Sequence, residues 1–378
     1  ALFSGKGDSS PGLDGLTREF YTHYWSLLGE PLLQLVREVQ KGKLLPRHFN
    51  HGMVALLHKT DTPAPLAGEF RPITLLNVDY KVVSGCIGIR VKEVLPSLVH
   101  DTQTGFVPGR LIFENLTFTR DVLEWARTTN HPIYIAFLDF EKAFDRVDWW
   151  YRDQVLLTMG FPPSIIHMIN SLYHEASVQL NINGELSDPI TQTRGVRQGC
   201  PLSPFIFALF VEPLGELMRD HTPTLGLPLP KPRSFHEQLR VLISQFADDT
   251  TLYTHSAGNM EAALTLVEDE FCAASGAKLN TRKTRTLQSH RKEHQQEIQV
   301  RLRSSVLKGA DWVRSLGAIY SEEVKPTDTF TRIIEKVTVR MTRLQHRHPS
   351  LIARVLYANT LLSSCLWYFT YFIIPQHT

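Results

Sequence analysis

The sequence predicts a mixed fold in which helices alternate with strands that pair through tight turns. Residues 133–138 form an almost wholly apolar run of strand length, as expected of a strand covered on both faces. Residues 241–253 predict two strands joined at Asp248-Asp249, because β-branched and aromatic residues flank a pair that favours turns. Asn183-Gly184, between two further strand-like segments, is the strongest short hairpin signal in the chain.

Apolar residues at helical spacing predict helices before and between these strands. The first covers residues 16–39, and we expect Pro31 to divide it in two, because proline lacks the N–H of the helical hydrogen bond. The next covers about residues 80–95 and is expected to end at Pro96. A short strand is predicted between them, at residues 53–57. Later helices are predicted at residues 113–127, 205–218 and 260–274, the last closed by Gly276.

Composition restricts the function only weakly. The 378 residues contain 40 Lys and Arg against 38 Asp and Glu, so the net charge of +2 does not by itself indicate a nucleic-acid partner. The four cysteines stand far apart, which indicates neither a zinc site nor a disulfide framework. The chain begins Ala-Leu-Phe without a charged-then-apolar leader, so we expect a fragment of a longer protein and no secretory signal. Residues 355–374 are uncharged over a membrane-spanning length, but polar residues interrupt them and we expect a buried helix.

Three carboxylates are placed where strands end. Asp139 directly follows the apolar strand, and Asp248 and Asp249 lie at the predicted hairpin turn. If the two strands are neighbours, the carboxylates converge and suit two Mg²⁺ ions roughly 3.5–4 Å apart, which clamp the attacking and leaving oxygens of phosphoryl transfer. Ordinary turn and helix-cap aspartates are the alternative, because sequence separation does not establish adjacency. Asp145 and Asp148 are better explained as first-turn aspartates of a helix.

Seven segments, taken in order, carry the strongest functional signal. They are Ser10-Pro11-Gly12-Leu13-Asp14-Gly15-Leu16, Phe70-Arg71-Pro72-Ile73, Thr104-Gly105-Phe106-Val107-Pro108-Gly109-Arg110, Leu138-Asp139-Phe140-Glu141-Lys142-Ala143-Phe144-Asp145, Arg197-Gln198-Gly199-Cys200-Pro201-Leu202-Ser203-Pro204, Phe246-Ala247-Asp248-Asp249, and Ser275-Gly276-Ala277-Lys278-Leu279-Asn280 with Lys283. In this order they resemble the motifs of reverse transcriptases of non-LTR (LINE-like) retrotransposons, over nearly the whole chain. Seven ordered matches are far more specific than any one of them.

The resemblance implies an α+β right-hand polymerase, in which an antiparallel palm sheet carries the carboxylates between fingers and a helical thumb. It implies an N-terminal extension of the fingers at residues 1–41, a reverse transcriptase domain of fingers and palm at 42–320, and a truncated thumb at 321–378. The implied activity is RNA-directed DNA polymerisation, with two Mg²⁺ ions, or Mn²⁺ as a substitute. The alternatives are a viral RNA polymerase and an inactive or domesticated nucleic-acid-binding remnant of such an element.

The resemblance also implies roles for individual residues. Asp139, Asp248 and Asp249 would be catalytic and would hold the metal ions, with help from the Phe140 carbonyl. The residues implied to bind the dNTP are Lys59, Arg71, Phe144, Gln198, Gly199 and Lys283. The Phe144 ring would exclude a 2′-hydroxyl, and Lys283 would donate to the leaving pyrophosphate. Leu316-Gly317 would form the primer grip, although Ser315 stands where an aromatic residue is usual.

The C-terminal part of the chain is basic on one predicted helical face. Its cations fall at steps of three or four residues, namely Arg332, Lys336, Arg340, Arg343 and Arg347. This face is either a solvated surface or a strip that lies along a phosphate backbone. The partners implied by the resemblance are an RNA template, a DNA primer and dNTPs, with no membrane. Nicking of the target is left to an endonuclease domain or protein outside this chain, and the implied location is intracellular, nuclear when chromosomal DNA is the target.

Overall fold

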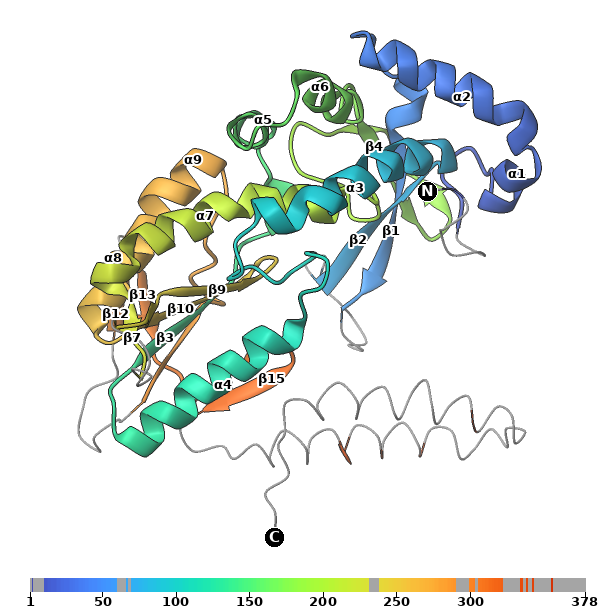
Figure 1. The fold of residues 1–378 in the computed structure, drawn as a ribbon. Helices are drawn as coiled ribbons and strands as arrows, with labels where there is room; N and C mark the ends of the chain where they lie inside the picture. The colour runs from blue at the N-terminus through green and yellow to red at the C-terminus, as the bar shows by residue number, and fades with distance from the viewer. Residues whose placement is uncertain are drawn as a thin grey trace. The chain divides into compact units, whose positions relative to one another are not determined.

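A computed structural model describes residues 10–59, 69–230, 238–289, 299–302 and 305–321, with isolated positions at 2, 66, 334, 335, 338, 342 and 355. The chain divides into two compact units between which it passes repeatedly. The first unit comprises residues 1–109, 140–217 and 266–279, and the second comprises residues 110–139, 218–265 and 280–378. Each unit contains a β-sheet of its own (Figure 1).

The sheet of the first unit has the strand order β2-β1-β4-β5, and β6 also pairs with β4. β1 runs antiparallel to β2 and parallel to β4. The strands are β1 (His51–His58), β2 (Phe70–Leu76), β4 (Ser177–Ile182), β5 (Glu185–Leu186) and β6 (Ile190–Thr191). The helical elements are α1 (Arg18–His23), α2 (Trp25–Gln40), η1 (Arg47–Asn50), α3 (Val78–Leu98), η3 (Ala143–Arg146), α5 (Trp149–Thr158), α6 (Pro163–Ser171), residues 203–217 of α7 (Ser203–Leu225), the π-helical turn η4 (Val267–Cys272) and α9 (Ala273–Ser275).

The second unit is organised around an antiparallel sheet with the strand order β11-β3-β10-β9. The strands of this sheet are β3 (Tyr134–Leu138), β9 (Ile243–Phe246), β10 (Asp249–Thr254) and β11 (Arg285–Gln288). Its helical elements in the described ranges are α4 (Ile112–Thr129), residues 218–225 of α7, and α8 (Ala257–Leu266) up to residue 265. Shorter pairs of strands are β7 (Leu227–Pro228) with β8 (Arg240–Val241), β12 (Gln299–Leu302) with β13 (Ser305–Lys308), and β14 (Trp312–Ser315) with β15 (Ala318–Ser321).

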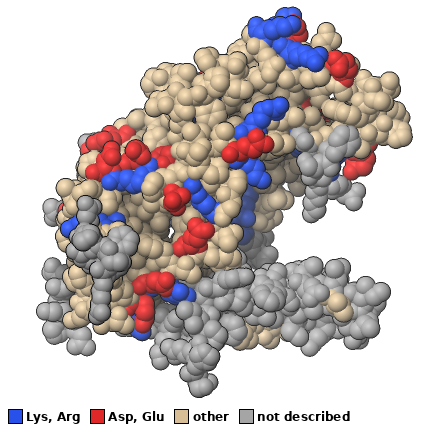
Figure 2. All heavy atoms as spheres, in the orientation of Figure 1, with Lys and Arg blue, Asp and Glu red and all other residues tan. Residues whose placement is uncertain are grey.

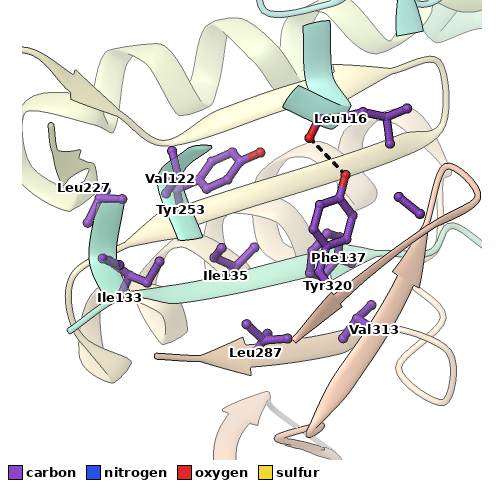
Figure 3. Packing of buried hydrophobic residues seen from close by; sticks show 12 residues of the cluster. Leu116, Val122, Ile133, Ile135, Phe137, Leu227, Tyr253, Leu287, Val313 and Tyr320 are labelled. Carbon is purple, nitrogen blue, oxygen red and sulfur yellow. Dashed lines mark hydrogen bonds between the residues drawn. The ribbon is translucent and has the colours of Figure 1, made fainter. Parts of the chain in front are cut away.

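One hydrophobic core binds the sheet of the second unit to α4 and to the β14–β15 hairpin (Figure 3). Ile135 and Phe137 of β3 lie in this core together with Leu116 of α4. The Phe137 and Tyr320 rings stack with centroids 5.4 Å apart, and the Tyr320 hydroxyl donates a hydrogen bond to the Leu116 carbonyl (3.3 Å; Figure 3). Ala136 and Leu138 are buried as well. The predicted strand is therefore covered on both faces, as its unbroken apolar composition indicates.

Tyr253 supplies a polar link inside this core. Its side chain is fully buried, and its hydroxyl shares hydrogen bonds with Ser244 Oγ (2.9 Å) and Thr119 Oγ1 (2.8 Å). We expect Tyr253→Phe to lower the free energy of unfolding by about 1–3 kcal/mol, because two buried hydroxyls lose a partner. Urea denaturation measures the change. Tyr134→Phe is the matched control, because the Tyr134 hydroxyl is only part-buried and, within the described part of the chain, accepts one hydrogen bond, from Gln288 Nε2 (3.1 Å). Equal losses in the two variants would contradict the prediction.

Most predicted elements are confirmed, but the position of the break in the first helix is wrong. Pro31 lies inside α2, and the break falls at Tyr24 instead. Leu28 and Leu32, on either side of Pro31, both pack against the core that contains Tyr21 and Val82. Burial of these side chains offsets the one hydrogen bond that proline removes.

Two other helix boundaries also differ from the prediction. Pro96 does not end its helix, since α3 continues to Leu98, where the last turn buries Leu95 and Val99. The helix for which Asp145 and Asp148 were expected to be first-turn residues is divided in two: the short 3₁₀ helix η3 contains Asp145, and α5 begins after Asp148. None of the helices in the described ranges is long and apolar enough to span a membrane. Of the uncharged segment 355–374, only Val355 is described, so the expected buried helix is not tested.

Candidate active site

Strand pairing brings the three predicted carboxylates to one edge of the second unit's sheet. β10 lies antiparallel beside β3 with Thr250 opposite Leu138, so Asp249 and Asp139 are the next residues on the two strands. The turn itself differs slightly from the prediction. It is formed by Ala247 and Asp248, whereas Asp249 already belongs to β10 and pairs with Phe246 of β9. Ala247 takes the left-handed conformation (φ 56°) that closes this tight hairpin.

Backbone hydrogen bonds fix the position of Asp139. Its N–H donates to Thr284 Oγ1 (3.2 Å), and its carbonyl accepts a hydrogen bond from the Asn280 N–H (2.7 Å). Asn280 belongs to one of the seven segments in the sequence, and Lys283 follows it in the same turn. The turn before β11 therefore holds the backbone of Asp139, and it leaves the carboxylate available for another role.

The electrostatics of the three carboxylates favour a cation. Asp249 is exposed at the start of β10, but the surrounding protein and then the charges of Asp248 and Asp139 raise the pKa of its carboxyl to about 7. Burial and the charge of Asp139 also raise the pKa of Asp248. The charged forms of Asp248 and Asp249 are thus disfavoured by burial and by nearby carboxylates, and a divalent cation would relieve both effects. Hard oxygen ligands are the donors that Mg²⁺ prefers, so the donor set fits such an ion.

The carboxylates are neighbours without forming a closed cage. No group of three His, Cys, Asp or Glu side chains within the described ranges is arranged so that it could hold a metal ion. A cavity of about 480 Å³ lies beside them in the same unit. Its lining includes Asp139, Asp249, Lys283 and Leu316, which the sequence predicted for three different roles. Gly317 follows Leu316 in the turn between β14 and β15, and both residues have positive φ.

The cavity also has lining residues that the sequence did not single out. Trp312 and Arg314 of β14 and Arg285 of β11 contribute to it. Trp312 supplies an aromatic side chain to the same β-hairpin in which Ser315 replaces the expected one. The sequence offered one signal for these two residues. Trp312 and Arg314 are two positions apart just before Leu316-Gly317, and residues at that spacing in a strand lie on the same face.

The predicted dNTP-binding residues other than Lys283 belong to the first unit. Arg71 is exposed on β2, and the Lys59 N–H donates to the Glu69 carbonyl (2.8 Å) at the other end of the β1–β2 connection. The Gln198 carbonyl accepts a hydrogen bond from the Thr74 N–H of β2 (2.7 Å). Gly199 has φ +121°, and a Cβ there would lie 2.4 Å from the Thr74 carbonyl oxygen. Gly199 is therefore required because the loop backbone passes close to β2 at this point.

Phe144 is held by two other aromatic rings of the first unit. It stacks on Phe207 of α7 with centroids 4.2 Å apart and meets Phe106 edge-on at 6.3 Å. These contacts fix the ring while leaving it half-buried. Stacking between rings at these separations limits rotation about the side-chain bonds.

A family model described as reverse transcriptase (RNA-dependent DNA polymerase) matches residues 57–317. The chain belongs to this family. The predicted resemblance to the reverse transcriptases of non-LTR retrotransposons is confirmed by relatives from such elements. The predicted α+β right-hand polymerase fold, with an antiparallel sheet under the carboxylates, is confirmed by the family and by the sheet itself.

Three relatives illustrate the similarity of this reverse transcriptase chain to known proteins. The transposon TX1 uncharacterized 149 kDa protein of Xenopus laevis is 33% identical over 368 residues, which is 96% of this chain and 27% of that protein. The Pol polyprotein of element R2DM of Drosophila melanogaster is 27% identical over 280 residues, 74% of this chain and 25% of that protein. The polymerase of the mobile element jockey, from the same organism, is 26% identical over 227 residues, 59% of this chain and 23% of that protein. The chain spans about a quarter of the length of these curated relatives.

Among solved structures, the reverse transcriptase chain is similar to apo telomerase from Candida tropicalis truncated from its C-terminal domain. The TM-score is 0.49 at 13% identity, with 81% of this chain and 59% of that chain covered. Members of the reverse transcriptase family use divalent metal ions and copy RNA templates into DNA.

Other predicted residues have structural roles or lie outside the described part. The Asp148 side chain accepts a hydrogen bond from the Tyr151 N–H (2.9 Å) and caps α5, as predicted. Cys200 is a packed thiol, 3% exposed. The basic face at Arg332, Lys336, Arg340, Arg343 and Arg347 lies outside the described residues. The cations around α2, by contrast, alternate with acids (Figure 2), since Arg37 pairs with Glu30, and Lys41 and Lys43 pair with Glu38.

Proposed function

We propose that this chain is the polymerase part of a non-LTR retrotransposon protein and adds dNTPs to a primer 3′-OH on an RNA template. The observation that carries the proposal is the pairing of β3 with β10, because it brings Asp139 beside Asp248 and Asp249. The raised pKa values of Asp248 and Asp249 support it, since carboxylates that repel one another are a suitable cation site.

The three carboxylates, with the Phe140 carbonyl, would hold two Mg²⁺ ions, or Mn²⁺ in their place. Such ions supply Lewis-acid stabilisation of the charge on the transferred phosphate. Lys283 shares its cavity with Asp139 and Asp249, and we assign it donation of a proton or of positive charge to the leaving pyrophosphate. Arg71 and Lys59 would bind the triphosphate, and the guanidinium fork of Arg71 suits phosphate oxygens. Gln198 would lie against the nucleotide, and Gly199 would keep the loop backbone close to β2.

Template and primer would be held mainly through phosphates, with little sequence readout. The basic face of the thumb at residues 321–378 and the Leu316-Gly317 turn are the proposed contacts. Residues 1–41 and 42–320 remain the proposed finger extension and polymerase domain. By family analogy the product is made by target-primed reverse transcription in the nucleus, with an endonuclease supplied from outside this chain.

Primer extension tests the proposed activity. The wild-type chain, with poly(rA)/oligo(dT), dTTP and Mg²⁺, should lengthen the primer, and EDTA should stop the reaction. Asp248→Asn is the control, because it is nearly isosteric and removes one proposed ligand. A folded wild-type protein that extends no primer on several RNA templates would overturn the proposal.

Sugar selection gives a second test. We expect Phe144→Ala to raise ribonucleotide incorporation relative to deoxynucleotides by about 10- to 100-fold, because the ring that would exclude the 2′-hydroxyl is removed. Competition assays with rNTP and dNTP pairs measure the ratio. Phe144→Tyr keeps the ring and should keep the selectivity. Unchanged selectivity in Phe144→Ala would contradict exclusion by this ring.

A further inference from the structure

Arg197 is a buried cation beside the proposed nucleotide contacts. Its side chain is 1% exposed, and its Nε donates to Gln192 Oε1 (2.8 Å). Its Nη2 donates to the Asn50 carbonyl, and the guanidinium lies 5.2 Å from the centre of the Tyr80 ring. Among the described residues, no carboxylate lies within ion-pair distance of it. The charge is therefore stabilised by neutral oxygens and by an aromatic face.

A buried ion of this kind is costly, and it contributes little stability compared with a well-packed apolar residue. Its contacts instead join separate segments of the first unit. Asn50 directly precedes β1, and its side chain donates to the Ser171 and His174 carbonyls (2.7 and 2.8 Å). Gln192 lies on the segment that leads into the loop at 194–202, and its N–H donates to the Ala176 carbonyl (2.8 Å). Arg197 thus ties the loop to β1 and α3 through one planar group.

The two residues after Arg197 are the ones assigned to the nucleotide. Gln198 accepts the Thr74 N–H, and Gly199 lies against the Thr74 carbonyl, three residues from Arg71 on the same strand. β1 and β2 are hydrogen-bonded neighbours, with Val54 opposite Thr74. The loop is attached to both of them, through the bond from Arg197 to Asn50 just before β1 and through the bond from Thr74 of β2 to Gln198. We therefore expect a change in the Arg197 contacts to move Gln198 relative to Arg71.

We propose that Arg197 is a positioning residue for the incoming nucleotide, which sets the Gln198-Gly199 backbone against β2 and so determines dNTP affinity. This inference rests on the proposed polymerase function. Lysine keeps the positive charge of arginine. It lacks the planar guanidinium that donates hydrogen bonds in two directions and packs on the Tyr80 ring. Arg197→Lys should therefore raise the KM for dNTP by about tenfold and leave kcat within about twofold, because binding and not the chemical step is affected.

Arg152 provides a matched control. It is also 1% exposed, lies 5.0 Å from the Tyr173 ring centre, and binds Asp153 and Asn170, and among the described residues no hydrogen bond or ion pair joins it to the loop. Arg152→Lys should lower thermal stability to a similar degree while the KM for dNTP stays within about twofold of wild type. Single-nucleotide extension on a defined RNA template measures KM and kcat, at a temperature where thermal melts show both variants folded.

Gln192→Ala provides a milder variant that removes a single hydrogen bond of the same group and should raise KM in the same direction by less. An active wild type whose KM is unchanged in both Arg197→Lys and Gln192→Ala, or raised equally in Arg152→Lys, overturns the inference. If Arg197→Lys does not fold, the Gln192→Ala result decides alone. An inactive wild type overturns the proposed function instead, so the two failures are distinguishable.

Discussion

Asp139→Asn should reduce primer extension by at least about a thousandfold, or ~4 kcal/mol in transition-state free energy, because it removes a proposed ligand of the catalytic cation. The substitution is nearly isosteric. The hydrogen bonds that hold Asp139, to Thr284 and from Asn280, involve its backbone, so the fold around it should persist. Steady-state extension rates at saturating dTTP measure the loss.

The same variant should gain stability when metal is absent. The charge of Asp139 raises the pKa values of both Asp248 and Asp249, so its removal should lower both. A carboxyl whose pKa is higher in the folded state than in the unfolded state costs stability above its folded pKa, and this cost is lost as the pH falls towards its unfolded pKa. For Asp249 this window runs from about 7 down to the ordinary value of 3.8. In EDTA at pH 8 the melting temperature should therefore rise, and at pH 6 it should rise by less, because more of Asp249 is then protonated.

Asp148→Asn is the control for both measurements. Asp148 caps α5, and asparagine is an equally good N-cap, so activity and stability should stay close to wild type. Loss of activity together with a lower melting temperature in Asp139→Asn would mean that the residue is structural. Activity above a tenth of wild type would remove Asp139 from the proposed site.

The sequence alone predicts the centre of this site well, for a physical reason. The strand at residues 134–138 is apolar throughout because both faces are buried, and Asp248 lies between two strand-forming segments at the point where the chain must turn. These local patterns identify strand ends, and the ordered motifs identify which ends belong together. The pairing of β3 with β10 is a tertiary contact, and no local sequence pattern predicts it.

Residues whose role depends on tertiary contacts are not predictable in this way. Arginine is almost never fully buried, so Arg197 and Arg152 would ordinarily be assigned to the surface. Trp312 reaches the cavity because the β14–β15 hairpin packs on the sheet. Pro31 and Pro96 fail as helix boundaries because neighbouring side chains are buried strongly enough to offset a lost hydrogen bond. In each case packing energy outweighs the local propensity.

Gly199→Ala should disrupt both the fold and the activity. At φ +121° an alanine is strained, and its Cβ would lie 2.4 Å from the Thr74 carbonyl oxygen. Relief of that clash requires the loop to move away from β2, which breaks the hydrogen bond from Thr74 to Gln198. We expect the free energy of unfolding to fall by about 3–5 kcal/mol, and primer extension to fall about 100-fold in the fraction that remains folded.

Gly184→Ala is the control that distinguishes backbone strain at positive φ from the steric clash of a new Cβ with a neighbouring strand. Gly184 also has positive φ, +94°, in the hairpin turn after Asn183, but nothing lies within 4 Å of the position of its Cβ. Its replacement should cost about 1–2 kcal/mol from strain alone and leave extension unaffected. Urea denaturation of the two variants gives the difference, which measures the contact between the loop and β2. If Gly199→Ala costs no more than Gly184→Ala, the loop tolerates displacement from β2, and the Gln198-Gly199 backbone is not held in the way that dNTP binding requires here.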